Sequence, residues 1–286
     1  MRKIMILNPA AGHGDAAKLN SPNEEIFEYT TTCVGDAERF VFEECQKDPE
    51  THFIVCGGDG TVNEVVNGIM KAEAGNTAVF SIVPTGSGND FVKNDFEKKK
   101  THKIDVIKIN DRYAINMINI GFDCDVVEKT QLYKKKHKGS TAYILGVVDV
   151  LFKPFGKNFK IKYTAPDGEV TELERECTLC AVANGAYCGG GFNFAPLSST
   201  TDGLLDALIV KKITRAKFIS IIAPFRAGKF IDADGALKKP FRGYIDYVKC
   251  TSIEIENLST VCIDGEVAEA DKVNISILPQ AINYHA

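Results

Sequence analysis

HFIVCGGDGTVNE, residues 52–64, is the stretch of sequence that decides the fold. Its apolar, strand-like beginning, HFIVC, runs directly into the glycine-rich turn GGDGT. Apolar residues then recur at the spacing of an amphipathic helix, at Val62, Val65, Val66, Ile69 and Met70. A strand that leads through such a turn into a helix is the unit from which parallel α/β sheets are built.

Two more strand-like pieces run into similar turns on either side of this unit. KIMIL leads into NPAAGHG at residues 8–14, and AVFSIVP leads into TGSGNDF at residues 85–91. Another helical segment follows Gly35, with Asp36 as its expected N-cap. Because strand and helix patterns alternate in this way, we predict a doubly wound, parallel α/β domain over residues 1–104.

The pattern changes after about residue 104. Most of the remaining chain has β-like segments separated by turn signals such as Asp264-Gly265, and helical patterns occur only near residues 139–152 and 214–230. We therefore predict a second, β-rich domain over residues 105–279, with residues 280–286 returning to the first domain. The two domains should pack closely, with a cleft between them.

Length and composition are those of an ordinary folded protein. The chain has 286 residues, of which 44% are hydrophobic and 25% charged. No apolar run reaches the roughly 18 residues of a membrane span, and KIMIL begins at once with no signal-peptide pattern, so we expect a cytoplasmic protein. The nine cysteines favour free thiols. The C-x-x-C spacing of Cys177 and Cys180 is also found in zinc and redox sites, but the apolar residues around this pair favour buried structural thiols.

Charge is distributed unevenly along the chain. Residues 1–97 contain 7 Lys and Arg against 16 Asp and Glu, whereas residues 98–286 contain 27 against 22. Basic residues cluster in KKKTHK (98–103), KKKHK (134–138) and KKITRAK (211–217). Each cluster alone is typical of a solvated surface, but together they also suit an anionic membrane surface. No recognition motif accompanies them, so we expect no nucleic-acid partner.

The turn GGDGT has the chemistry of a phosphate site. Its glycines let the backbone approach a phosphate closely, and the following helix presents free N–H groups and a positive dipole end. Asp59 would repel a phosphate unless it holds a magnesium ion there. The alternative is a tight connection in which Asp59 only caps the helix. A Walker lysine motif is absent, so a nucleotide would be held without one.

Seven motifs in order give the chain a family resemblance. They are NPAAG (8–12), GGDGT (57–61), VPTGSGNDF (83–91), NIGFD (119–123), GGGF (189–192), AP…TDGLLD (195–206) and IDGE (263–266). In this order they resemble the diacylglycerol kinase catalytic family, and most of all its compact bacterial lipid kinases. NAD kinases and phosphofructokinases share only GGDGT-like turns. The resemblance implies a nucleotide-binding α/β domain, a C-terminal β-sandwich domain, and phosphorylation of a lipid hydroxyl by ATP.

The resemblance also implies site residues. It assigns the role of general base to Glu266, with Asp264 beside it and Asp59 at the catalytic magnesium. A structural magnesium or calcium ion would bind Asp202 and the main-chain carbonyls of Ser199 and Leu204. The implied ATP contacts are Asn8, Thr31, Gly57, Gly58, Asp59, Gly60, Thr61, Val62, Asn63, Gly86, Ser87 and Asn89.

The residues alone leave simpler interpretations open for several of these positions. Asp264-Gly265 predicts a β-hairpin with a type I′ turn, and Asp202 could simply cap a turn. Ser87 and Asn89 suit ordinary turn and cap chemistry.

Our leading hypothesis is a lipid kinase that uses ATP and magnesium, with diacylglycerol converted to phosphatidic acid in phospholipid biosynthesis. It would act peripherally at an anionic membrane surface. A homodimer is one possible form of the protein. The alternatives are an NAD kinase and a non-catalytic regulator that binds nucleotide or lipid. The basic second part and TDGLLD argue against an NAD kinase, and the three carboxylates Asp59, Asp202 and Glu266 argue against a pure binder.

Overall fold

The computed structural model describes residues 1–10, 26–86, 88–94, 96–134, 140–152 and 156–286. The elements of the first part are β1 (Lys3–Leu7), β2 (Ile26–Thr30), α1 (Asp36–Lys47), β3 (His52–Gly57), α2 (Asp59–Lys71), β4 (Val79–Pro84) and the 3-10 turn η2 (Phe91–Lys93). Those up to the middle of the chain are β5 (Thr101–Ile109), β6 (Arg112–Ala114), β7 (Met117–Gly121), α3 (Phe122–Lys134), α4 (Ser140–Leu151), β8 (Lys157–Thr164) and β9 (Val170–Ala183). The remaining elements are β10 (Tyr187–Cys188), β11 (Phe192–Asn193), β12 (Leu205–Lys211), α5 (Arg215–Arg226), β13 (Ile245–Cys250), β14 (Ser252–Glu256), β15 (Thr260–Ile263), β16 (Glu266–Glu269) and β17 (Lys272–His285).

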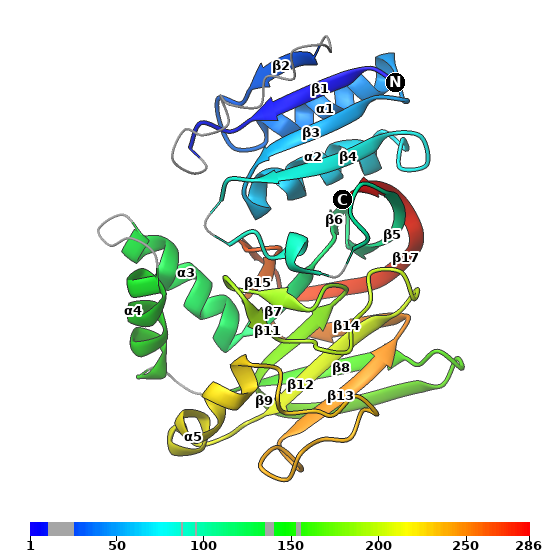
Figure 1. Ribbon diagram of the computed structural model, residues 1–286. Helices are drawn as coiled ribbons and strands as arrows, with labels where there is room; N and C mark the ends of the chain where they lie inside the picture. Colours follow the sequence, from blue (N-terminus) through cyan, green and yellow to red (C-terminus); the bar gives the residue numbers. More distant parts are fainter. Residues whose placement is uncertain (11–25, 87, 95, 135–139, 153–155) are drawn as a thin grey trace.

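The N-terminal domain is built on a parallel sheet with strand order β2-β1-β3-β4-β17 (Figure 1). Ile4, Ile6, Phe53 and Val55 are fully buried because the middle strands are covered by other elements. Their core includes Val65 of α2 and the apolar face of α1. The predicted parallel α/β domain is confirmed.

The start of α1 differs from the sequence prediction. Gly35, with a φ of 81°, is the N-cap, and Asp36 is the first helical residue. The Asp36 carboxylate instead accepts the Thr32 N–H at 2.9 Å and pairs with Arg39 at 2.7 Å. These hydrogen bonds lower the pKa of Asp36 to about 2. The prediction of Asp36 as N-cap was wrong because a left-handed glycine already turns the chain into the helix.

The C-terminal domain is a β-sandwich, as predicted. One layer has the order β16-β15-β7-β9-β12-β13, and the other has β5-β17-β14-β8-β9. The 14-residue strand β9 belongs to both layers, because its beginning pairs with β8 and its end pairs with β7 and β12. Ile118, Phe159, Ile209 and Ile253 lie in the core between the layers.

Helices cover the outer face of the first layer. Phe122 and Val126 of α3, Val150 of α4 and Phe218 of α5 share a core with Leu208 of β12. In Figure 1, α3 and α4 lie side by side at the edge of the sandwich nearest the first domain. Helices α4 and α5 agree with the predicted helical patterns, but α3 was missed and its sequence was assigned no structure.

Two neighbouring strands pass from one domain to the other. Ile104 of β5 and Ile282 of β17 lie in the core of the first domain, whereas Ile107 and Ile275 of the same strands lie in the sandwich core. Further along, Asn283 and Tyr284 pair with β4. The domains are therefore joined by a paired ribbon, drawn in green and red in Figure 1. The division into residues 1–104, 105–279 and 280–286 stays a prediction.

All nine cysteines are free thiols, and all but Cys33 are buried. Burial raises the pKa of Cys177 to about 11, which suits an unreactive thiol. Among the residues that the structure describes, no helix is long and apolar enough to cross a membrane.

Candidate active site

The segments that follow strands β1, β3 and β4 meet at the carboxyl edge of the parallel sheet. Asn8, after β1, donates its side-chain N–H to the Thr61 hydroxyl at 2.8 Å. Gly86, after β4, passes so close to Gly58 that a Cβ at Gly86 would collide with its backbone. Asn89 folds the second turn by accepting the Gly86 N–H at 3.1 Å and donating to its carbonyl at 2.6 Å. The predicted ATP contacts Asn8, Gly58, Thr61, Gly86 and Asn89 therefore lie together.

The two acidic residues of these turns, Asp59 and Asp90, also lie together. The Asp90 N–H donates to Asp59 Oδ1 at 2.8 Å. Burial raises the pKa of Asp59, and the negative charge of Asp90 raises it further. Lys93 pairs with Asp90 at 2.5 Å, and the Gly190 N–H of the GGGF segment donates to its other oxygen at 2.8 Å.

Asp59 and Asp90 fit a magnesium ion. Both supply hard oxygen donors. The observation that carries this fit is that the two carboxylates border one space: a Cβ built on Gly88 would lie 2.6 Å from Asp59 Oδ2 and 3.6 Å from Asp90 Oδ2. Lys93 is already a cationic partner of Asp90 there. The catalytic metal itself stays a prediction.

The IDGE segment forms the predicted hairpin. Ile263 of β15 pairs with Glu266 of β16, and the two residues between them, Asp264 and Gly265, have φ values of 46° and 95°. Two positive φ angles are what a type I′ turn requires. The hairpin prediction is thus confirmed. The same hairpin also lies next to the first turn of α2.

Asp264 is an anchor inside this hairpin. Its Oδ1 accepts the N–H groups of Asn116 and Met117, and its Oδ2 accepts those of Ile115 and the Asn63 side chain, at 2.8–3.1 Å. Burial raises its pKa, and these hydrogen bonds offset part of the rise. With both oxygens occupied by donors, Asp264 is suited to holding the turn rather than to proton transfer.

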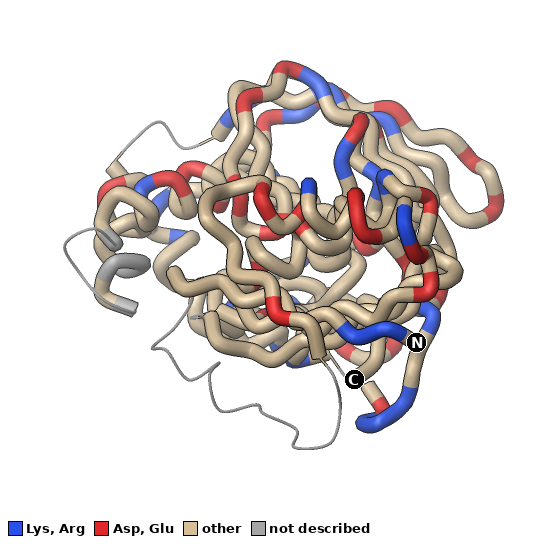
Figure 2. Tube along the Cα trace, turned by 90° about the horizontal axis from the view of Figure 1, so that it is seen from above, with Lys and Arg blue, Asp and Glu red and all other residues tan. Residues whose placement is uncertain are grey.

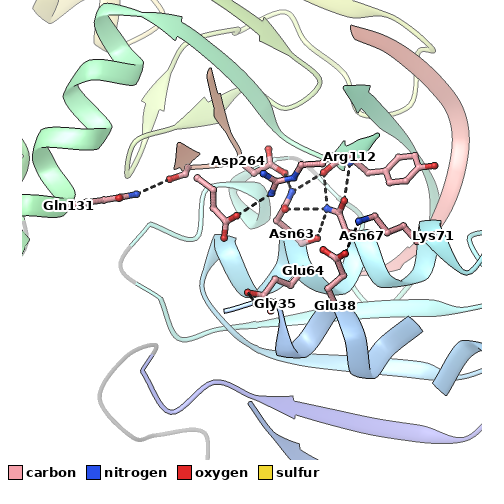
Figure 3. Close-up of polar contacts among 12 residues, drawn as sticks. Gly35, Glu38, Asn63, Glu64, Asn67, Lys71, Arg112, Gln131 and Asp264 are labelled. Carbon is pink, nitrogen blue, oxygen red and sulfur yellow. Dashed lines mark hydrogen bonds and ion pairs between the residues drawn. The ribbon is translucent and has the colours of Figure 1, made fainter. Parts of the chain in front are cut away.

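Glu266 lies two residues after Asp264, and its side chain is directed toward the GGDGT turn. A Cβ built on Gly60 would lie 3.4 Å from Glu266 Oε1, which places this oxygen at the first turn of α2. Its Oε2 accepts from Arg112 at 3.1 Å, and the Glu266 side chain is one-third exposed. Figure 3 shows the IDGE hairpin above α2, with Arg112 and Asn63 between them. The proposed base and GGDGT are therefore neighbours across the two domains.

A polar network fastens this arrangement to α2. The Tyr113 carbonyl of β6 accepts from Asn63 at 3.0 Å and from Asn67 at 2.8 Å, and the Tyr113 N–H donates to Asn67 at 3.0 Å (Figure 3). Asn63 also donates to Asp264. Asn63 was predicted to contact ATP, but it is buried and fully used as a link between the domains.

The remaining predicted nucleotide contacts have different positions. Thr31 is buried at the end of β2 and its hydroxyl donates to the Leu7 carbonyl at 3.3 Å. Val62 is buried in the core of the first domain, so only its backbone could serve a ligand. Gly57 lies under the Thr61 side chain. Ser87 lies outside the described residues.

The aspartates of the TDGLLD segment pair with a cation from a neighbouring strand, Lys249 of β13. Asp202 Oδ1 accepts the Leu204 N–H at 3.1 Å, and Oδ2 pairs with Lys249 at 2.8 Å. Lys249 also pairs with the buried Asp206 at 3.1 Å. The Ser199 hydroxyl lies 3.3 Å from that of Thr201. A metal ion at Ser199, Asp202 and Leu204 stays a prediction, and it would have to share Asp202 with an ammonium group. Because Asp202 already pairs with Lys249, we derive no step of the reaction from this loop.

Some residues of the site were not singled out from the sequence. Asp90 belongs to the GSGNDF motif, so its place in that motif could have identified it as a site residue. Lys93 is one helical turn further on and could have been found from that spacing. Arg112 gave no signal, because 154 residues separate it from Glu266.

Comparison with known proteins agrees with this geometry. The family described as the diacylglycerol kinase catalytic domain matches residues 2–120, and that described as the YegS C-terminal NAD kinase beta sandwich-like domain matches residues 116–286. Fold and family matches thus define a lipid kinase-like protein with an N-terminal α/β domain and a C-terminal β-sandwich domain. The chain belongs to the lipid kinase family that combines these two domains.

Individual relatives extend over most of the chain. A diacylglycerol kinase of Bacillus subtilis is 29% identical over 87% of this chain and 82% of its own. A protein of Chromohalobacter salexigens named probable lipid kinase YegS-like is 28% identical over 80% and 74%. The crystal structure of a diacylglycerol kinase from Bacillus anthracis has a TM-score of 0.72 at 28% identity, over 99% and 96% of the two chains. The predicted family is confirmed.

Proposed function

We propose that this protein transfers the γ-phosphate of ATP to the primary hydroxyl of diacylglycerol, in a reaction that needs magnesium, and so produces phosphatidic acid. The observation that carries the proposal is the position of Glu266. It is a partly exposed carboxylate beside the first turn of α2, where GGDGT presents backbone N–H groups for phosphates.

The chain's own residues account for most of such a reaction. Gly58 and Gly86 let the turns after β3 and β4 pack closely together at the start of α2, and the N-terminus of α2 favours negative charge. Asp59 and Asp90 would hold magnesium, which would neutralise the phosphates. Acceleration of phosphoryl transfer comes mainly from such positioning and charge neutralisation.

Glu266 supplies the proton acceptor. In the transfer, the acceptor oxygen bonds to the γ-phosphorus, the bond from that phosphorus to the β,γ-bridging oxygen breaks, and ADP leaves. The proton of the acceptor hydroxyl passes to Glu266 as the new bond forms. Asp264 supports this step indirectly, because its four hydrogen bonds fix the turn that carries Glu266.

The choice of diacylglycerol rests on relatives. The Bacillus subtilis relative is named a diacylglycerol kinase, and its match covers both domains. A sphingoid base, phosphatidylglycerol or a polyprenol would present a similar hydroxyl to Glu266. An NAD kinase would use a soluble acceptor instead.

A phosphate-transfer assay tests the proposal. The purified protein would be given radiolabelled ATP, magnesium and one acceptor at a time: diacylglycerol, a sphingoid base, phosphatidylglycerol, a polyprenol or NAD. We expect labelled phosphatidic acid as the main product, and no product when magnesium is chelated. Labelling of NAD alone would replace the lipid kinase by an NAD kinase, and nucleotide binding without any transfer would indicate a regulator.

We also propose that the protein acts while docked on an anionic bilayer. The basic second part of the chain and the exposed apolar side chains of Val148, Phe152 and Ile219 support this. Its lysines at 135, 136 and 138 lie outside the described residues, as does the side chain of Lys134.

A further inference from the structure

Arg112 is the hydrogen-bonding partner of the Glu266 carboxylate. Its Nη2 donates to Glu266 Oε2 at 3.1 Å, while Oε1 faces Gly60. The Arg112 guanidinium therefore binds one oxygen of the Glu266 carboxylate, and the other oxygen stays directed toward the GGDGT turn. Both side chains are about one-third exposed, at 32% and 33%.

The backbone that carries Arg112 is held firmly. Strand β6 has three residues and pairs with β5, and Arg112 lies opposite Ile109. Its other edge is fastened to α2 by the hydrogen bonds of Tyr113 with Asn63 and Asn67. Since α2 begins in GGDGT, the same helix sets the position of the phosphate turn and of the arginine (Figure 3).

Glu266 needs such a partner because another carboxylate, that of Glu64, lies near it. Glu64, one turn along α2, is fixed by accepting the N–H groups of Gly35 and Ala37 at 2.9 and 3.1 Å. Burial raises the pKa of Glu64, and the charge of Glu266 contributes to the rise. The two carboxylates thus repel each other, and without Arg112 a partly exposed glutamate would turn toward solvent.

We propose that Arg112 is a positioning residue for the reaction: it holds the Glu266 carboxylate at the first turn of α2, with Oε1 free to accept a proton. This inference rests on the proposed function, in which Glu266 is the base. It assigns Arg112 an effect on turnover and little effect on folding, because an ion pair this exposed contributes little to stability.

The test compares Arg112→Gln, Arg112→Lys and Lys272→Gln. Lys272 forms a similarly exposed pair with Glu254 and Glu256 on the outer sheet, so it is the matched control. The acceptor is dioctanoylglycerol in detergent, or whichever lipid the acceptor panel selects. We expect kcat of Arg112→Gln to fall by about 10²-fold, with the KM for ATP and the melting temperature unchanged. Arg112→Lys should recover part of kcat, and Lys272→Gln should equal wild type.

A double mutant tests whether Arg112 affects kcat through Glu266. If Arg112 acts through Glu266, then Glu266→Gln combined with Arg112→Gln should be no slower than Glu266→Gln alone. A multiplied loss of kcat in the double mutant would overturn the inference. So would a raised KM for ATP with kcat preserved, since that would make Arg112 a nucleotide contact.

The same variants distinguish a failure of the positioning role of Arg112 from a failure of the proposed function. If Glu266→Gln loses activity while Arg112→Gln keeps wild-type kcat, only the positioning role fails. If Glu266→Gln keeps wild-type turnover, the base assignment in the proposed function fails, and the role of Arg112 fails with it.

Discussion

At the scale of single residues, Glu266 combines accessibility with a fixed position. It is one-third exposed, so an acceptor could reach it, whereas its neighbour Asp264 is buried with all its oxygens occupied. This contrast separates two carboxylates that stand two residues apart. The sequence motif assigns both to the site, and burial distinguishes the proposed base, Glu266, from the anchor, Asp264.

We expect Glu266→Gln to lower kcat by roughly 10²- to 10⁴-fold with the fold intact, because the amide keeps the size of the side chain but cannot take a proton. Steady-state kinetics together with a thermal melt would check this. Near wild-type turnover of a well-folded variant would rule out the base role.

Asp59 carries a charge that the folded protein disfavours. Its pKa is raised by burial and by Asp90, so the folded chain binds this proton more tightly than the unfolded chain does. The resulting contribution to stability is fully present below the unfolded pKa and is lost as pH rises through the folded value. At neutral pH without magnesium, ionised Asp59 therefore lowers the free energy of unfolding.

From this sign we predict that Asp59→Asn melts at the same temperature as wild type or higher at pH 7 without magnesium. The difference should shrink as pH falls toward 4. Activity should nevertheless drop, because a cation loses a ligand. Melting curves across pH and magnesium titrations of activity measure the two effects. Superimposable magnesium titrations of mutant and wild type would remove Asp59 from the metal site.

At the scale of elements, the β15–β16 hairpin carries the base. Gly265 has a φ of 95° and open space around its missing Cβ, so an alanine there meets backbone strain but no clash. Gly235, with a φ of 84° and equally open space, is a matched position in another turn.

Each glycine-to-alanine change should cost about 1–2 kcal/mol of stability, since each forces a left-handed backbone on an L-residue. Only Gly265→Ala should also reduce kcat, because relaxation of its turn moves Glu266 away from α2. Denaturant unfolding and kinetics of both variants would check this pair. Equal activity in the two would mean that the hairpin tolerates movement without consequence for the reaction.

At the scale of the whole molecule, the distribution of charge bears on the proposed docking to a membrane. Figure 2 looks onto the first domain from above and shows acidic and basic residues interspersed along the trace. The excess of basic residues lies instead in residues 98–286, which also form the sandwich and its helices. Exposed Phe152 and Ile219, at 83% and 63%, belong to the chain around α4 and α5. This composition suits a surface that meets anionic headgroups.

We expect binding to anionic vesicles that weakens with added salt, because each basic residue contributes about 1 kcal/mol, screened beyond a Debye length. Changing Lys134, Lys135, Lys136 and Lys138 to glutamate should weaken it further, without loss of activity on a detergent-dispersed short-chain lipid. Changing Lys98, Lys99, Lys100 and Lys103 instead measures how much a second basic cluster contributes to the same binding. Equal binding to neutral and anionic vesicles at low salt would identify the clusters as solvated surface.

Much of the fold followed from local patterns. Buried strands, amphipathic helices and glycine turns are set by residues within a few positions of each other, which is why α2, α5 and the Asp264-Gly265 turn were predictable. Helix α3 was not, because its apolar residues follow no clear helical stripe. It becomes a helix by packing Phe122 and Val126 onto the sandwich.

The family, the two kinds of domain and the motif residues could be read from the chain alone, since motif order and strand periodicity are properties of the sequence. Which of those residues contact one another depends on the folded structure. Glu266 meets Gly60 and Arg112, and Lys249 meets Asp202, across separations that no local pattern encodes. The Glu266 contacts form because β5 and β17 run together between the domains, whereas Lys249 reaches Asp202 because β13 pairs with β12.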